Sequence, residues 1–185
     1  TGEPLADVVV RVADEAEPVG DRARRDAPLR SDAGVVIDHV SAPIPEHHPL
    51  VDHVDLVPAR GFTNAVIEVH LGQGAAVDLV LVQRESDSAF HVSNLAARVG
   101  RDARLSAHTL TLGGALVRCD ASFLLADEGA QCRIHGLFAG SGQQLLDHHT
   151  LVDHAMPHGE SRQLTKGILA GSARGVFRGR VIVRP

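Results

Sequence analysis

The chain is 185 residues long, which suits a single domain with one substantial core. Apolar residues make up 44% of it, yet no apolar run approaches the roughly 20 residues that a membrane helix needs. The formal net charge of −5, without aromatic side chains interleaved among basic ones, argues against nucleic acid as a partner.

The first 60 residues predict a loop-rich N-terminal segment that leads into the core. Seven of the nine prolines lie before residue 59, and proline removes a backbone donor and fixes φ. Within this segment the best strand candidates are residues 5–12 and 34–40, while residues 14–32 are charged enough for a surface loop or a short helix. Four of its side chains are expected at the surface, namely His39, His47, His48 and His53.

From about Phe62 to Pro185 the sequence changes to short runs of Val, Leu, Ile and Ala separated by glycine-containing turns, which is typical of strands. Residues 76–82, 105–112 and 178–183 alternate apolar and polar residues, as strands with one buried face do. The polar side chains expected to point outward include Asp78, Ser106, His108 and Arg178.

These turns repeat with a period that is typical of a solenoid. Four segments lead from a tight turn into an alternating strand, and they begin at Gly72, Gly100, Asp127 and Gly171. The first three carry an alanine after the turn, at Ala75, Ala103 and Ala130, 28 and then 27 residues apart. A period between about 20 and 50 residues with this content indicates stacked coils. We therefore predict an all-β fold with a parallel β-helix core over residues 61–185, and an antiparallel sandwich remains the alternative.

The ends of the predicted solenoid are expected sites of association with another chain. An open-ended solenoid leaves unpaired strand edges, which need a cap or a partner. The sequence begins without Met and stops directly after an apolar run, so we expect a β-helix truncated at both ends. Homodimerisation through the solenoid edge is a corresponding expectation.

The densest group of possible metal ligands is Asp147, His148, His149, Asp153 and His154. Imidazoles and carboxylates bind zinc and iron well. In a strand, His149 and Asp153 share one face with Asp147, whereas His148 and His154 share the other. The candidate metal ligands are His149, Asp153 and His154. Because they are divided between two faces, a compact site needs a contribution from another coil. The competing interpretation is that these histidines stack on neighbouring rungs or bond to threonine and backbone groups.

Signatures of a catalytic centre are missing from the sequence. It contains no G-x-S-x-G, and Lys166 precedes rather than follows the nearby glycines, so no phosphate loop is predicted. Cys119 and Cys132 are too few for a disulfide framework and lack neighbours that would lower a thiol pKa, so we expect reduced thiols in a cytoplasmic protein. The remaining scattered histidines, expected at the surface, are His70, His91, His108 and His135. No catalytic residue is assigned.

The stretch from Gly142 to Val181 is the most distinctive part of the sequence. It carries a basic surface formed by Arg162, Lys166, Arg174, Arg178 and Arg180. Its motifs are Asp147-His-His-Thr150, Asp153-His154, Lys166-Gly-Ile-Leu169, Ser172-Ala-Arg-Gly-Val-Phe177 and Gly179-Arg-Val181. Together they resemble the SufB/SufD family. The doubled histidine and the preceding Gln143-Gln144 look more like SufD than SufB, and the likeness weakens towards Phe62.

This resemblance implies a right-handed parallel β-helix that pairs with a SufB-like subunit and, through a helical region absent here, with a SufC-like ATPase. The family builds iron–sulfur clusters, and its cluster residues lie beyond the equivalent of Pro185. We therefore assign no cofactor-binding residue to this chain and expect the iron–sulfur cluster only in the assembled complex.

Three functional hypotheses follow. The first is a scaffold subunit of the SufBCD complex, which is not an enzyme by itself. The alternative is a metal-dependent enzyme on a β-helix frame that uses Asp147, His149, Asp153 and His154. The third is a plain self-associating β-solenoid without metal or Suf partners. The long match from Lys166 to Phe177 favours the scaffold.

Overall fold

The computed structural model describes residues 8–13, 49–54 and 61–185, and every regular element in these ranges is a strand. The strands are β1 (Val8–Ala13), β2 (Pro49–Val54), β3 (Phe62–Leu71), β4 (Ala76–Gln83), β5 (Phe90–Val99), β6 (Arg104–Thr111), β7 (Leu116–Leu125), β8 (Gln131–Gly140), β9 (Leu145–His154), β10 (Glu160–Leu169) and β11 (Arg174–Val183). The described part of the chain contains no helix that is long and apolar enough to cross a membrane.

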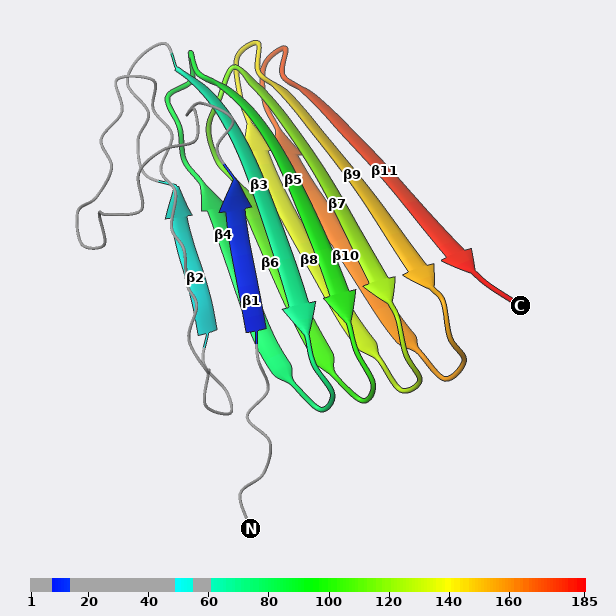
Figure 1. Cartoon of the computed structure of the whole chain (residues 1–185). Coiled ribbons are helices and arrows are strands. Elements are labelled where there is room, and N and C mark those ends of the chain that lie inside the picture. Colours follow the sequence, from blue (N-terminus) through cyan, green and yellow to red (C-terminus); the bar gives the residue numbers. More distant parts are fainter. Residues whose placement is uncertain (1–7, 14–48, 55–60) are drawn as a thin grey trace, which may run out of the picture.

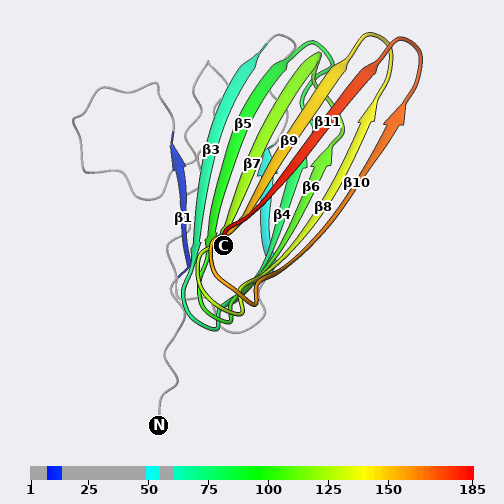
Figure 2. The same ribbon diagram turned by 90° about the vertical axis from the view of Figure 1, so that its right-hand side faces the viewer.

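The strands form two sheets that face each other (Figures 1 and 2). Sheet A has the order β1-β3-β5-β7-β9-β11, and sheet B has the order β10-β8-β6-β4-β2. All neighbours pair in parallel except β1 with β3. From β3 onward the chain alternates between the sheets and completes about four turns of a parallel β-solenoid. The predicted parallel β-helix is confirmed, and the antiparallel sandwich is wrong.

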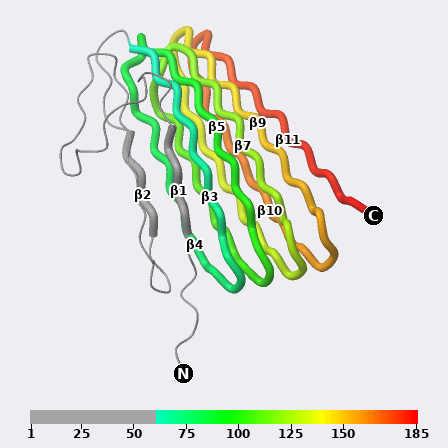
Figure 3. The backbone as a smooth tube through the Cα atoms, in the orientation of Figure 1, coloured from blue at the N-terminus to red at the C-terminus, as the bar shows by residue number. Residues whose placement is uncertain are grey.

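The repeat in the sequence is the length of one coil, and Figure 3 shows the same backbone path recurring coil after coil. Ala76 pairs with Arg104, and Arg104 pairs with Gln131, so the strands of sheet B stack in the predicted period. The alanines just before them, at positions 75, 103 and 130, are all buried. However, the segment at Gly171 leads into β11 of sheet A, so its alignment with the other three was wrong. Both half-coils begin with turns of small residues, so the sequence does not show which of the two sheets a given turn leads into.

The turns from sheet A to sheet B place one residue per coil in the left-handed region of φ. These residues are Gly74, Asp102, Gly129 and His158, with φ of 71°, 55°, 72° and 62°. Glycine adopts this conformation without a steric penalty, and the two other residues, Asp102 and His158, are at exposed positions. A common turn therefore sets the coil length.

The core lies between the sheets and is built from small and medium apolar side chains. One inward row of sheet A runs from Val69 through Ala97 and Phe123 to Val152, and all four are buried. Leu105 and Ile134 belong to the same core cluster from sheet B. The alternation predicted for residues 76–82 agrees with the burial in the first half of β4, where Val77 and Leu79 are buried and Asp78 between them is exposed. In β11 nearly every residue is exposed, so the alternation predicted for residues 178–183 stays a prediction.

Two strands come from the predicted N-terminal segment. The candidate strand at residues 5–12 overlaps β1, and β2 joins sheet B beside β4. The candidate strand at 34–40, the charged run at 14–32, and His39, His47 and His48 lie outside the described residues. The predicted boundary between the N-terminal segment and the β-helix core, at residues 60 and 61, stays a prediction.

The last coil carries much exposed apolar surface. Among the described strands, β10 and β11 each have a hydrogen-bonded neighbour on one side. The exposed large apolar side chains on these strands are Leu164, Ile168, Leu169, Val176, Phe177, Val181 and Val183. The basic residues predicted for this stretch are exposed as well.

Candidate functional site

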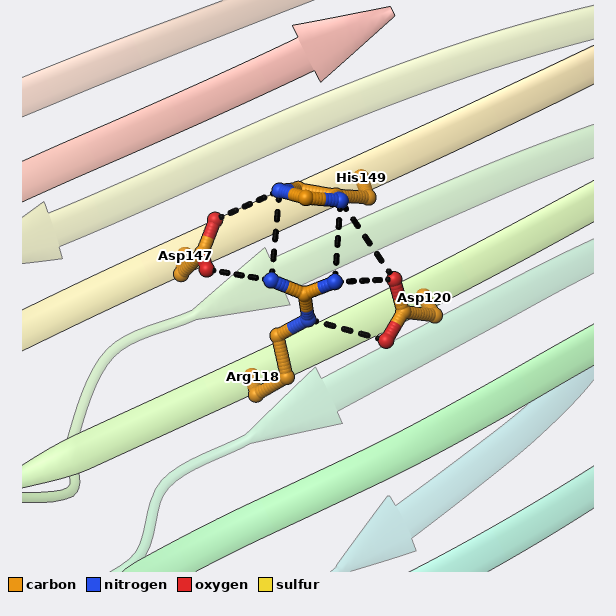
Figure 4. A network of polar contacts seen from close by, with 4 residues as sticks. All are labelled: Arg118, Asp120, Asp147 and His149. Carbon is orange, nitrogen blue, oxygen red and sulfur yellow. Dashed lines mark hydrogen bonds and ion pairs between the residues drawn. The ribbon is translucent and has the colours of Figure 1, made fainter.

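A network of charged side chains lies on the outer face of sheet A, where β7 and β9 are adjacent (Figure 4). The Arg118 guanidinium donates through Nε and Nη2 to both carboxylate oxygens of Asp120, at 2.8 Å each. Its Nη1 donates to Asp147 Oδ2 at 2.5 Å. The ring nitrogens of His149 lie 2.9 and 3.2 Å from Nη2 and Nη1. One guanidinium therefore holds two carboxylates and an imidazole on two successive coils.

The charges of this network compensate one another. The Asp120 carboxylate raises the pKa of Arg118, and the Arg118 guanidinium in turn holds the pKa of Asp120 below its usual range. Nε2 of His149 also lies 3.1 Å from Asp147 Oδ1, which forms an ion pair when the imidazole is protonated. Because a guanidinium occupies the space between the carboxylates, the network needs no bound cation to balance its charge.

A groove of about 360 Å³ adjoins the network. Its lining side chains come from β5, β7, β9 and β11, and they are Asn94, Asp120, Ala121, Ser122, His149, Thr150, Leu151, Arg178 and Arg180. Both arginines are exposed, and β11 aligns Arg178 with His149 of β9. Guanidinium groups donate in a planar fork, so this lining suits a carboxylate or phosphate group.

The three predicted metal ligands engage three different partners. His149 belongs to the Arg118 network, Asp153 accepts hydrogen bonds from Arg184 at 2.6 and 3.0 Å, and His154 Nε2 bonds to Ser161 Oγ at 2.9 Å. Four residues along a strand span about 13 Å, so an ion shared by His149 and Asp153 requires both side chains to leave these partners and turn toward each other. Among the described residues, no group of three or more His, Cys, Asp or Glu is arranged to hold a metal. Metal binding by these residues stays a prediction, which the zinc titration below tests.

We expect Arg118→Gln to lower the free energy of unfolding by about 1 kcal/mol, because it leaves two carboxylates side by side and solvent screens this part-exposed network. The measurement is urea denaturation followed by circular dichroism. Combined with Asp147→Asn, the loss should be smaller than the sum of the two single losses. Arg98→Gln is the control, since Arg98 lies 4.0 Å from Asp127 in an exposed pair. Additive losses would mean that the two side chains are not coupled.

A second polar group is buried inside the solenoid, near the turn between β4 and β5. Nδ1 of His91 lies 3.1 Å from Glu85 Oε1, and Gln83 Nε2 donates to Glu85 Oε2 at 3.1 Å. An ionised carboxylate only accepts, so Nδ1 of His91 is the donor. Burial raises the pKa of Glu85, but the hydrogen bond and charge of His91 and the hydrogen bond of Gln83 outweigh it and leave this pKa lowered. The surface position predicted for His91 is wrong, since only 3% of the residue is exposed.

His148 also points into the solenoid, where its ring stacks on Phe138 with centroids 5.2 Å apart. Its Nε2 has no hydrogen-bond partner, and burial lowers its pKa to about 4. Cys119 pairs with His148 in the register of β7 and β9. Burial raises the pKa of Cys119, and it raises the pKa of Cys132 to about 12, so neither thiol is activated. Both are free, as the sequence predicted.

Gln144, one of the paired glutamines of the sequence motif, ties neighbouring turns together. Its Nε2 donates to the Gly114 carbonyl at 2.8 Å, and its Oε1 accepts from the Ser141 backbone at 2.6 Å. Neither Arg118 nor Glu85 was among the functional candidates predicted from the sequence. For Arg118 the coil period was an available signal, because it lies one coil before Asp147.

The sequence of residues 40–185 matches a family model described as the SufBD core domain of SUF-system FeS cluster assembly. Three curated proteins are similar to it. An iron–sulfur cluster assembly SufBD family protein of Synechocystis sp. is 32% identical over 122 residues, which cover 66% of this chain and 27% of that protein. One from Mycobacterium tuberculosis strain H37Rv is 33% identical over 125 residues, covering 64% and 32%. The SufD protein of Escherichia coli K12 is 29% identical over 135 residues, covering 72% and 32%. The matched part is thus at most about a third of each relative's length.

Proposed function

This chain belongs to the SufBD core family of the SUF iron–sulfur cluster assembly system, and we propose that it is a SufD-type scaffold subunit that catalyses no reaction by itself. The observation that carries this proposal is the family match over residues 40–185, which include the solenoid from β2 to β11. The iron–sulfur cluster is then a product of the assembled complex, built in the cytoplasm, rather than a resident group of this chain.

The chemistry of the described side chains supports a scaffold. The polar side chains of the Arg118 network form hydrogen bonds within that network, and Glu85 and His91 form a hydrogen bond with each other. These contacts stabilise the solenoid. Burial raises the pKa values of both thiols, and a protonated thiol is a poor nucleophile. An activated nucleophile needs a base within hydrogen-bond reach and a lowered pKa, which neither cysteine has in the described part of the chain.

Two observations favour the SufD type over the SufB type. The SufD protein of Escherichia coli is among the relatives and aligns over 135 residues. The motif Asp147-His148-His149-Thr150 with its lead-in Gln143-Gln144 is the part of the sequence that looks most like SufD. In the structure these residues lie in the first part of β9 and in the turn before it. Asp147 and His149 belong to the outer network, and His148 between them is buried.

The proposed partners are a SufB-like subunit and a SufC-like ATPase. The family match supports both, since the family model describes SUF-system assembly and the SufD protein of Escherichia coli is among the relatives. A homodimer that forms through a solenoid edge is the second proposed mode of association, because strand edges pair readily with other strands.

Co-expression of the chain with SufB-like and SufC-like subunits, with any native C-terminal continuation of the chain included so that the SufC-binding region can be present, should yield a complex that contains all three. Native mass spectrometry identifies this complex by its mass. If the chain purifies alone, the scaffold proposal fails.

A further inference from the structure

Two histidines meet on the outer face of sheet B, away from the network on sheet A. His108 lies on β6 and His135 on β8, and the parallel register pairs them directly. They are separated by 27 residues, which is one coil of the solenoid. Both side chains reach solvent. Neither belongs to the group of metal ligands that the sequence suggested.

The geometry of the pair fits chelation of one ion. The two Nδ1 atoms are 3.4 Å apart, and the ring centroids are 4.9 Å apart with the planes inclined by 51°. Two imidazole nitrogens bound to one tetrahedral Zn²⁺, each at its usual bond length, lie about 3.3–3.4 Å apart. The backbone ladder fixes this spacing, so little ordering is needed when an ion binds.

We propose that His108 and His135 form a surface binding site for a divalent transition-metal ion of the Zn²⁺ type, with water completing the coordination. Both rings then carry their protons on Nε2, which leaves the two Nδ1 lone pairs free to bind the ion. Imidazole is a good ligand for zinc, copper and nickel, whereas Mg²⁺ and Ca²⁺ prefer oxygen, so the site should select the former class.

The surroundings set the expected strength of binding. In the same row, Val80 of β4 and Leu164 of β10 flank the pair, so this row supplies no further ligand. The next row contains the Asp78 carboxylate together with Arg133 and Arg162, so its net charge disfavours a cation. Two protein ligands are fewer than the four of a structural zinc site, and binding should be correspondingly weaker and reversible. This site is independent of the proposed scaffold function.

Isothermal titration of the chain with Zn²⁺ at about pH 8, where ordinary imidazoles are neutral, tests the proposal. His108→Ala and His135→Ala should each weaken one binding event by at least about tenfold, since even residues that only orient a ligand contribute that much. His70→Ala is the matched control, because His70 is exposed on β3 of the other sheet. Co²⁺ should give the absorption of a tetrahedral complex in the unsubstituted chain and lose it in both variants.

Thermal melting verifies that the variants fold. The proposal is overturned if both His108→Ala and His135→Ala bind Zn²⁺ like the unsubstituted chain, or if no binding occurs at all. His149→Ala tests the ligands suggested by the sequence: loss of the same event in this variant alone would also overturn the proposal and would support that other site. Complex formation with Suf subunits is measured separately and does not depend on any of these results.

Discussion

Phe123→Ala should lower the free energy of unfolding by about 3–5 kcal/mol, the range found for large aromatic residues removed from tight cores. Phe123 is the largest of the fully buried side chains, with 1% of the residue exposed. Its neighbours in the inward row of sheet A are Ala97 and Val152, which are too small to fill the space that the ring leaves. The cavity therefore persists, and the lost contacts add to the lost burial.

Urea denaturation followed by far-ultraviolet circular dichroism measures this loss. Phe90→Ala is the matched control, since it removes the same ring from a residue that is 49% exposed. We expect the control to change the free energy of unfolding by less than about 1 kcal/mol. Equal losses in the two variants would mean that Phe123 does not lie between two packed sheets, and the solenoid cross-section would need revision.

Most of the fold follows from the sequence because a solenoid repeats one local rule. The alternation of apolar and polar residues fixes which side chains point inward, and the spacing of Ala75, Ala103 and Ala130 equals the coil length. The sequence does not show which turns lead into sheet A and which lead into sheet B. The turn at Gly171 and the turn at Gly72 use similar small residues, although they lead to opposite sheets.

The buried polar group could not be predicted by the same rule. Alternation assigns charged residues to the outside, yet Glu85 and His91 are inside and bond to each other. Each is acceptable there only because the other is present, and an unpaired buried charge would cost several kcal/mol. Nothing along the sequence indicates this pairing, since Glu85 lies in a turn and His91 begins the next strand.

The contacts on the outer faces were open to prediction through the coil period. Arg118 and Asp147 are 29 residues apart, and His108 and His135 are 27 apart. In a parallel ladder, residues one coil apart lie on adjacent strands at the same height. The coil period therefore predicts contacts between polar side chains as well as the fold. The predicted metal ligands, in contrast, are neighbours along one strand, where four positions span about 13 Å.

Acidification from about pH 6.5 to about pH 4 should reduce the stability of the folded chain by up to about 3 kcal/mol through His148 alone. Burial lowers the pKa of His148 from 6.5 to about 4 in the folded state. Between these values the unfolded chain binds more protons than the folded chain, so the free energy of unfolding falls as the pH falls. Each pKa unit contributes about 1.4 kcal/mol. The lowered pKa of Glu85 acts in the same direction, but below its usual value of 4.5.

His148→Leu isolates this effect, because leucine fills a similar volume and does not titrate. Urea denaturation at a series of pH values should give a much flatter dependence between pH 6.5 and 4.5 in this variant than in the unsubstituted chain. His70→Leu is the control and should leave the dependence unchanged, since His70 is exposed on the outer face of sheet A. Below about pH 4.5 the variant should still lose stability, because the Glu85–His91 pair remains. A dependence that is equally steep with and without His148 would place the responsible group elsewhere and would mean that this imidazole reaches water.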